Sequence, residues 1–164
     1  MGNENELAGV QGSCLCGSVR FELLGKINGF YFCHCMRCRR STGSAHASNI
    51  FTDPENILWL SGQELIKRYE LPEAERFAKQ FCSECGSLVP LVNRDGTKLI
   101  IPAGTLEQSF EAHPQKNIFW DSPPAPAWTS RKQSLESASP DNNVCNSCLA
   151  ADFCRRSSVT SASS

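Results

Sequence analysis

The sequence has no long apolar run. No window approaches the roughly 18 consecutive apolar residues that a membrane-spanning helix needs. The first residues, MGNENELAGVQGS, lack the apolar segment of a secretory signal, and Glu6 stands where an N-myristoylation motif requires Ser or Thr. We therefore expect a cytoplasmic protein with no membrane partner.

An excess of charge of one sign is also missing. The 164 residues include 16 Lys and Arg against 17 Asp and Glu, which gives a formal net charge of -1. A nucleic-acid-binding domain typically presents a strongly basic face, and so does a protein that binds acidic membranes. We therefore expect no nucleic-acid partner. The sequence also contains no glycine-rich phosphate-binding loop.

Cysteine, in contrast, is abundant, with ten residues. In a reducing compartment, clustered cysteines bind metal more often than they form disulfides. Seven of them form three clusters: Cys14-x-Cys16, Cys33-x-Cys35-x-x-Cys38 and Cys82-x-x-Cys85. The other three could bind a further metal ion, but they have no fourth ligand and no neighbouring strands, so we favour their interpretation as adventitious or reactive thiols. They are Cys145, Cys148 and Cys154.

Up to about residue 128 the pattern is dominated by short strands. The segment SVRFELLG alternates apolar and charged residues with the period of a half-buried strand, and LIKRYEL and RFAKQF do so less regularly. In SLVPLVNRDGTKLIIPAG, two apolar runs flank Asp95 and Gly96, which favours a hairpin. A short helix is expected after Cys35, ending at Gly43.

The composition divides the chain into three parts. We expect a flexible N-terminus at residues 1–11, a single mainly β domain with short helical pieces at residues 12–128, and a tail at residues 129–164. The tail is rich in Ser and Asn and offers few apolar residues for a core. We therefore predict that the tail is disordered.

Two of the cysteine clusters predict a closed metal site. The motifs CLCG and CSECG both end in glycine, and Gly17 and Gly86 allow tight turns in which backbone N–H groups point at the thiolate sulfurs. Four thiolates from two such turns make a tetrahedral site typical of structural zinc. The alternative is four ordinary buried thiols, which the pairing and the glycines disfavour. The predicted ligands are Cys14, Cys16, Cys82 and Cys85.

The middle cluster has three cysteines and no evident fourth ligand. Three protein ligands with one open position describe a catalytic zinc, whose vacant position takes water or a substrate atom. The predicted ligands are Cys33, Cys35 and Cys38. Such a sulfur-rich site also favours a substrate that is itself a thiol.

Polar residues beside this cluster are candidate substrate contacts. Three thiolates on Zn²⁺ have a net charge of about −1, which Arg37, Arg39 and Arg40 can offset while they attract an anionic substrate. Equally, each arginine could lie on the solvated face of a short helix. Neighbouring residues of a strand face opposite ways, so we expect His34 to line the pocket or to pack rather than to bind the metal.

A dithiol redox site is another interpretation of these clusters. Cys35-x-x-Cys38 and Cys82-x-x-Cys85 both have the spacing of a redox pair. Neither motif lies in the βαβ context of thioredoxin-like proteins. We therefore rank a redox function below zinc binding.

The order and the flanks of the seven cysteines resemble one known family. The stretches GSCLCGSVRFEL, FCHCMRCRRSTGS, RFAKQFCSECGSLVP and AGTLE, with a looser match in HPQKNIFWDSPPAPAW, are similar to the glutathione-dependent formaldehyde-activating (Gfa-like) family, which includes the domain of centromere protein V. Together they span roughly residues 12–128. The resemblance implies a zinc-stapled β-tent fold.

The same resemblance implies roles for the cysteines. By position, the two outer clusters match the structural zinc ligands of the family, and the middle cluster matches its catalytic zinc ligands. This agrees with the division reached from the glycine turns and the ligand count. We therefore expect two Zn²⁺ ions per chain, one in a closed site and one in an open site.

The function that the resemblance implies is that of a zinc-dependent carbon–sulfur lyase. The family is named for the combination of glutathione with formaldehyde to S-(hydroxymethyl)glutathione, in either direction. The expected partners are therefore a small thiol such as glutathione and an aldehyde, with the arginines after Cys38 holding a glutathione carboxylate. The alternative is a non-enzymatic zinc-binding scaffold for a protein partner, and the middle cluster favours the enzyme.

Overall fold

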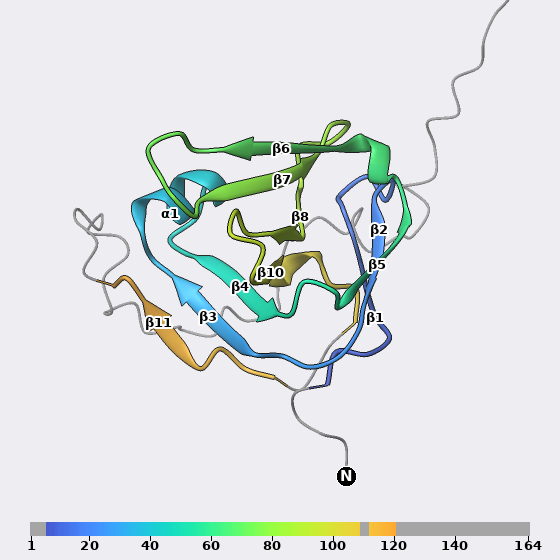
Figure 1. The fold of residues 1–164 in the computed structure, drawn as a ribbon, viewed down its shortest axis with the longest axis horizontal. Coiled ribbons are helices and arrows are strands. Elements are labelled where there is room, and N and C mark those ends of the chain that lie inside the picture. Colours follow the sequence, from blue (N-terminus) through green and yellow to red (C-terminus); the bar gives the residue numbers. More distant parts are fainter. Residues whose placement is uncertain (1–5, 109–111, 121–164) are drawn as a thin grey trace, which may run out of the picture. The chain divides into compact units, whose positions relative to one another are not determined.

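Strands account for most of the regular structure of the protein (Figure 1). The computed structural model describes residues 6–108 and 112–120, and within them the chain forms eleven strands, one α-helix and two short 3-10 helices. This confirms the mainly β fold that the alternating segments predict. The predicted tail at residues 129–164 lies outside the described residues. In the described ranges, no helix has the length and apolar character needed to cross a membrane.

The first sheet joins three antiparallel strands in the order β1-β2-β5. Its strands are β1 (Val10–Ser13), β2 (Arg20–Leu23) and β5 (Ile57–Ser61). β2 alternates as its sequence predicts, because Phe21 and Leu23 are buried while the charged residues beside them are only partly covered. Leu7 is also fully buried, although it lies in the segment expected to be flexible. The folded part of the chain thus begins before residue 12.

The second sheet has five strands in the order β11-β3-β4-β10-β9. Its strands are β3 (Gly29–Cys33), β4 (Ala47–Thr52), β9 (Leu91–Val92), β10 (Leu99–Pro102) and β11 (Lys116–Ile118). All neighbours are antiparallel except β11, which runs parallel to β3 and pairs Ile118 with Cys33. This pairing brings the end of β11 to the place where the middle cysteine cluster begins.

The third sheet has the order β6-β7-β8 and is antiparallel, with β6 and β7 along the top of Figure 1. Its strands are β6 (Ile66–Glu70), β7 (Ala78–Cys82) and β8 (Leu88–Val89). The segments LIKRYEL and RFAKQF thus form neighbouring strands. The helices are α1 (Met36–Thr42), which follows β3, and the 3-10 helices η1 (Gln63–Leu65) and η2 (Ala103–Thr105).

The helix α1 begins and ends where its sequence predicts. Cys35 is the N-cap, and its sulfur accepts a hydrogen bond from the backbone N–H of Cys38. Gly43 is the C-cap, with a φ of 63° in the left-handed region, and its N–H donates to the carbonyl oxygen of Arg39. A helix of 7 residues is not stable by itself. Its position therefore depends on the packing of its buried residue, Cys38.

The predicted Asp-Gly hairpin exists, but its first half divides between two sheets. Asn93 closes the turn by accepting N–H hydrogen bonds from Thr97 and Lys98, and Gly96 has a positive φ of 74°. Pro90 interrupts the apolar run SLVPLVN, because proline has no N–H to donate to a ladder. As a result β8 pairs with β7, whereas β9 pairs with β10.

The main core lies between the first and second sheets. Its fully buried side chains include Phe21 and Leu23 from β2, and Ile50, Leu99 and Ile101 from β4 and β10. A second, smaller cluster contains Val19, Val89, Cys14 and Cys82. A third contains Cys33, Cys38 and Ala47. Thiols thus belong to both minor clusters, where they take the place of larger apolar side chains.

Gly12 in β1 is required by the packing of the main core. A Cβ at this position would clash with the ring of Phe21 and lie 2.7 Å from the carbonyl oxygen of Thr105. We expect Gly12→Ala to lower the free energy of unfolding by about 1–3 kcal/mol, because its buried neighbours must shift. Urea denaturation of the purified protein measures this change.

Gly104→Ala is the matched control. A Cβ on Gly104 would have no atom within 4 Å, so the free energy of unfolding should stay within about 0.5 kcal/mol of the wild-type value. Equal losses of stability in the two variants would contradict the close packing of β1 against Phe21 and η2.

Candidate metal centres and the adjoining cavity

Four cysteine sulfurs meet between the first and third sheets. Cys14 and Cys16 lie in the turn between β1 and β2. Cys82 ends β7, and Cys85 lies in the turn that follows it. The four Sγ atoms are all within 4.8 Å of one another. The distance is 3.4 Å between the sulfurs of Cys14 and Cys16, and 3.9 Å between those of Cys16 and Cys82, which are 66 positions apart in the chain.

Tight turns aim backbone N–H groups at this cluster. Gly17 and Gly86 have positive φ angles of 76° and 72°, which glycine adopts without strain. The N–H of Gly17 donates to the carbonyl oxygen of Cys14, and that of Gly86 donates to the carbonyl oxygen of Cys82. Val19 donates its N–H to the Cys14 sulfur at 3.3 Å. The two motifs therefore form the turns that their glycines predict.

The four-sulfur cluster has the donor set and the spacing of a tetrahedral zinc site. Zn–S bonds of about 2.3 Å place the sulfurs of such a site roughly 3.8 Å apart. The separations of 3.4 and 3.9 Å are close to that value. They are much longer than the S–S bond of about 2.05 Å in a disulfide, and the seven cysteines in the described ranges are free.

The surroundings of this cluster give its thiols different pKa values. Burial raises the pKa of the Cys14 thiol to about 11. Burial also acts to raise the pKa of Cys85, but the backbone N–H groups of Ser87 and Cys16 outweigh it and bring the pKa to about 6. A metal ion that binds four thiolates must displace the remaining protons, so its affinity for the cluster should fall as the pH falls.

The middle cluster gathers three sulfurs at the junction of β3 and α1. Cys33 ends β3, Cys35 caps α1, and Cys38 lies in the first turn of the helix. Their Sγ atoms are within 4.8 Å of one another, and those of Cys33 and Cys35 are 3.6 Å apart. Phe77 and Ile118 pack against them. Within the described part of the chain, no fourth Cys, His, Asp or Glu joins this set.

Hydrogen bonds within the middle cluster concentrate negative charge on one sulfur. Donation from the thiols of Cys33 and Cys38 lowers the pKa of Cys35 to about 2. The bonds to Cys33 and Cys35, together with burial, raise the pKa of Cys38. Cys35 is therefore a thiolate at neutral pH, which is the form of cysteine that binds a metal.

A cavity of about 780 Å³ opens beside the middle cluster. All three cysteines of this cluster line the cavity, whereas none of the four cysteines of the other cluster does. The rest of the wall comes from Arg37 on α1, from Phe119 after β11, and from the segment between β6 and β7. The lining residues of that segment are Glu73, Ala74, Glu75, Arg76 and Phe77. The incomplete ligand set thus has space beside it for a substrate.

The predicted arginine contacts occupy different environments. Arg37 lines the cavity, and its guanidinium carbon lies 5.7 Å from the centre of the Phe77 ring. Arg39 is half-buried and Arg40 is exposed on the same helix, and neither lines the cavity. The structure therefore brings one of the three arginines directly to the space beside the thiols.

His34 packs behind the middle cluster and does not line the cavity. Only 9% of it is exposed, and its Nε2 atom lies 2.9 Å from Oδ1 of Asn117 on β11. The centre of its ring is 4.3 Å from that of Trp120 and 5.3 Å from that of His46. His34 thus ties the cysteine-bearing segment to β11 and to a small group of aromatic rings.

Lys79 on β7 is a site residue that sequence reasoning missed. Its Nζ atom lies 5.5 Å from the centre of the Phe77 ring. Burial lowers its pKa, and interaction with the cysteines of the middle cluster, Cys38 first, acts to raise it. In the sequence Lys79 is only one charged residue of the alternating segment RFAKQF. Nothing in that pattern indicates that its strand passes the middle cluster.

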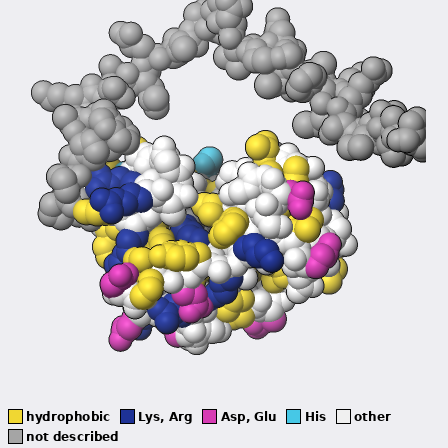
Figure 2. All heavy atoms as spheres, turned by 90° about the horizontal axis from the view of Figure 1, so that it is seen from above, with side chains coloured by type: hydrophobic (Ala, Val, Ile, Leu, Met, Phe, Trp, Pro, Cys, Tyr) yellow, Lys and Arg dark blue, Asp and Glu magenta, His cyan; other side chains and the backbone are white. Residues whose placement is uncertain are grey.

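The charged side chains around the cavity are of both signs, so no excess of one charge surrounds it. On the face that Figure 2 shows, which is seen from above β6, basic, acidic and apolar side chains lie side by side. The cavity itself has Arg37 and Arg76 in its wall, together with Glu73 and Glu75. A ligand would therefore be oriented by individual charged groups within a few ångströms.

These features define a class of protein: a mainly β chain with one closed thiol cluster and one open thiol cluster that lines a cavity. A model of the family described as glutathione-dependent formaldehyde-activating enzyme matches residues 9–122. This match spans more than half of the chain. The chain therefore belongs to this family, as the order of its cysteines predicts.

A solved structure supports the fold. The crystal structure of a Rhodobacter sphaeroides protein superimposes with a TM-score of 0.50 at 24% sequence identity. The superposition covers 60% of this chain and 89% of that chain. Among curated proteins, none matches the sequence significantly.

The two clusters should respond differently when one cysteine is replaced. We expect both Cys82→Ser and Cys35→Ser to lose about one zinc ion per chain. Cys82→Ser should also unfold at a much lower urea concentration, because binding of a structural zinc ion contributes directly to folding. Cys35→Ser should keep a cooperative unfolding transition near that of the wild type. Plasma mass spectrometry and urea denaturation measure the two effects.

Ser83→Ala is the control for these variants, since Ser83 is exposed and adjoins Cys82. It should keep both its metal content and its unfolding midpoint. If either cysteine variant retained all of the bound zinc, or if both unfolded at the same urea concentration, the division into a closed and an open site would be wrong.

Proposed function

We propose that this protein is a zinc-dependent carbon–sulfur lyase that acts on the adduct of glutathione, or a related thiol, with a small aldehyde. The observation behind this proposal is the cavity of about 780 Å³ lined by all three thiols of the middle cluster. The description of the family, which names glutathione and formaldehyde, supports the choice of substrates. The reaction is the formation or cleavage of S-(hydroxymethyl)glutathione.

The proposed reaction is an addition: a C–S bond forms as the π bond of the carbonyl group breaks, and one proton moves from sulfur to oxygen. The glutathione thiol loses its proton, its sulfur attacks the carbonyl carbon of formaldehyde, and the carbonyl oxygen takes up a proton. The reverse reaction cleaves the same C–S bond, and neither direction needs an oxidant or a reductant. A zinc ion held by the middle cluster would supply a positive centre that lowers the pKa of a thiol.

The cysteines of the middle cluster would hold this ion as thiolates. Cys35 has the low pKa that suits this role, and Cys33 and Cys38 would lose their protons when the metal binds. Three thiolates and one Zn²⁺ leave a net charge of about −1, which disfavours the approach of a substrate thiolate. The ammonium group of Lys79, close to the cluster, would offset this charge.

Arg37 would bind a carboxylate of glutathione, because its guanidinium group lies in the cavity wall. Arg39 and Arg40, on the same helix but outside the lining, would add positive charge at a greater distance. His34 would act as a positioning residue, since its contacts with β11 hold the cysteine-bearing segment in place. Phe77 would form an apolar part of the wall that limits the access of water.

We also propose that the protein works in a reducing compartment such as the cytoplasm. The seven cysteines of the described residues are free thiols. Thiol clusters of this kind persist where glutathione and thioredoxin keep cysteine reduced. Glutathione, the proposed substrate, would be abundant in the same compartment.

The full-length protein should accelerate the exchange of ¹³C-labelled formaldehyde between its free form and its glutathione adduct. Cys35→Ser should reduce this acceleration by roughly 100-fold or more, because it removes a ligand of the proposed metal itself, and loss of a residue that only hydrogen-bonds to a metal ligand already costs about 10–100-fold. NMR exchange spectroscopy measures both rates. Ser83→Ala should match the wild type. Unchanged exchange in Cys35→Ser would contradict the proposed site.

Lys79→Met should raise the KM for glutathione by about tenfold, the equivalent of one charge interaction of roughly 1.4 kcal/mol. Lys79→Arg keeps the positive charge and should restore most of the loss, which a purely structural defect would not show. Lys67→Met, at an exposed position on the neighbouring strand β6, is the control and should leave the KM unchanged. Equal KM values for Lys79→Met and Lys67→Met would exclude an electrostatic role for Lys79.

A zinc-binding scaffold for a protein partner is the second candidate function. It is favoured by β5, the edge strand of the first sheet, on which Leu58 and Leu60 are 51% and 44% exposed. An exposed apolar edge strand is a common site for pairing with another chain. Normal zinc content without any acceleration of exchange would favour this function over the lyase.

A further inference from the structure

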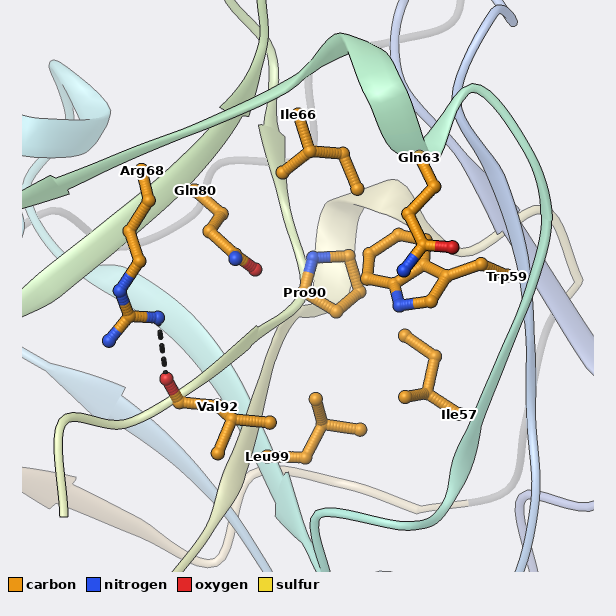
Figure 3. A pocket seen from close by; sticks show the side chains of 9 residues that line it. All are labelled: Ile57, Trp59, Gln63, Ile66, Arg68, Gln80, Pro90, Val92 and Leu99. Carbon is orange, nitrogen blue, oxygen red and sulfur yellow. Dashed lines mark hydrogen bonds between the residues drawn. The ribbon is translucent and has the colours of Figure 1, made fainter. Parts of the chain in front are cut away.

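A second cavity, of about 280 Å³, lies where the three sheets meet (Figure 3). Its wall takes residues from β5 in the first sheet, from β9 and β10 in the second, and from β6 and β7 in the third. It shares no lining residue with the cavity beside the middle cysteine cluster. A ligand here would therefore be separate from the proposed lyase substrate.

The floor and one side of this cavity are apolar. Leu99 is 1% exposed, and Pro90 is also fully buried. Trp59 supplies a flat aromatic face, and Figure 3 shows its indole beside Pro90 and Ile57. Behind it, the Phe21 ring of the main core packs edge-on at a centroid distance of 5.8 Å. The indole is thus held from the core side, which favours a preformed surface for a flat apolar group.

The guanidinium group of Arg68 places a positive charge on the side of the cavity opposite Trp59. Nε of Arg68 donates to a Glu70 carboxylate oxygen at 2.8 Å. Its Nη1 donates to the Val92 carbonyl oxygen at 2.8 Å, which is the dashed line in Figure 3. Glu70 also pairs with Arg94 at 3.1 Å. Two arginines thus share one glutamate, so the group keeps a net positive charge. These two bonds hold the guanidinium in place while leaving other N–H donors for a ligand.

Two amide side chains face the same space. Figure 3 shows Gln80 between Arg68 and Pro90, and Gln63 beside Trp59. Neither side-chain amide makes a hydrogen bond to any residue that the structure describes. Each amide therefore has a free donor and a free acceptor that a ligand can use.

We propose that this cavity binds a small organic carboxylate with a flat apolar body. The body would lie between Trp59 and the floor of Pro90 and Leu99, and the carboxylate would face Arg68 and accept hydrogen bonds from the two amides. A volume of 280 Å³ corresponds to about nine water molecules at roughly 30 Å³ each. The ligand should therefore have on the order of ten non-hydrogen atoms, which excludes glutathione with its roughly twenty.

Phenylacetate has this size, body and charge, and we choose it as the probe. Titration of the full-length protein, followed by ¹H–¹⁵N NMR, should give a Kd of about 0.1–1 mM. The largest shifts are expected at the Trp59 indole N–H and at the Gln63 and Gln80 side-chain amides. Phenylacetamide, which has the same shape without the charge, should bind at least about tenfold more weakly, because a hydrogen bond to a charged group contributes more than a neutral one.

Arg68→Gln should raise the Kd for phenylacetate by at least about tenfold, since it removes the charged donor. Arg20→Gln is the matched control: Arg20 is also a half-exposed strand arginine paired with a glutamate, Glu107 at 3.3 Å, but it lies outside the cavity. Its Kd should stay within about twofold of the wild type. If Arg68→Gln does not fold, Gln80→Leu tests the same site and should weaken binding by several-fold.

Three results would overturn the proposal. These are the absence of saturable binding up to about 10 mM phenylacetate, equal affinities in Arg68→Gln and Arg20→Gln, and shifts confined to residues around the middle cysteine cluster. None of the readouts depends on lyase activity, so this test and the test of the proposed function can fail independently.

Discussion

The meeting of four sulfurs from two distant turns is the contact on which the union of the first and third sheets depends. The turn after β1 and the turn after β7 belong to different sheets. Among the residues that the structure describes, Val19 and Val89 are the other fully buried members of their cluster, and the partly buried Trp59, Leu65 and Ile66 pack against it. Burial of two such side chains contributes only about 1.5–3 kcal/mol each. The four sulfurs have the arrangement needed to hold a metal ion, and an ion bound there would add to the stability of this junction, as structural metals do in small domains.

Cysteine side chains form two clusters whose surroundings differ. In the outer pair of turns, four thiols converge in an arrangement that could hold a metal ion, and none of them lines the cavity beside the middle cluster. In the middle cluster, three thiols come from one short segment at the junction of β3 and α1, and the space where a fourth ligand would stand adjoins a cavity. Four protein ligands are typical of a structural zinc site. Three protein ligands beside an open space are typical of a catalytic zinc site, in which a substrate can reach the metal.

Positive charge is held in place near both cavities, but by different means. Beside the middle cluster, the guanidinium of Arg37 and the ammonium of Lys79 both lie within 6 Å of the Phe77 ring, so one aromatic side chain positions two cations. In the cavity between the sheets, Arg68 is fixed by hydrogen bonds to Glu70 and Val92. In each case the charge is oriented before a ligand arrives, which reduces the entropy that binding costs.

The sequence by itself determined the features that depend on neighbouring residues. The glycine-ended cysteine turns, the alternation of β2 and the caps of α1 all follow from local backbone geometry, and the order of the cysteines indicated the family. The tertiary structure alone decided that Pro90 separates β8 from β9, that Lys79 lies near the middle cluster, and that His34 contacts Asn117. It also created the cavity between the sheets. These features depend on which strands pair across long stretches of chain, and local periodicity does not specify the partner of a strand.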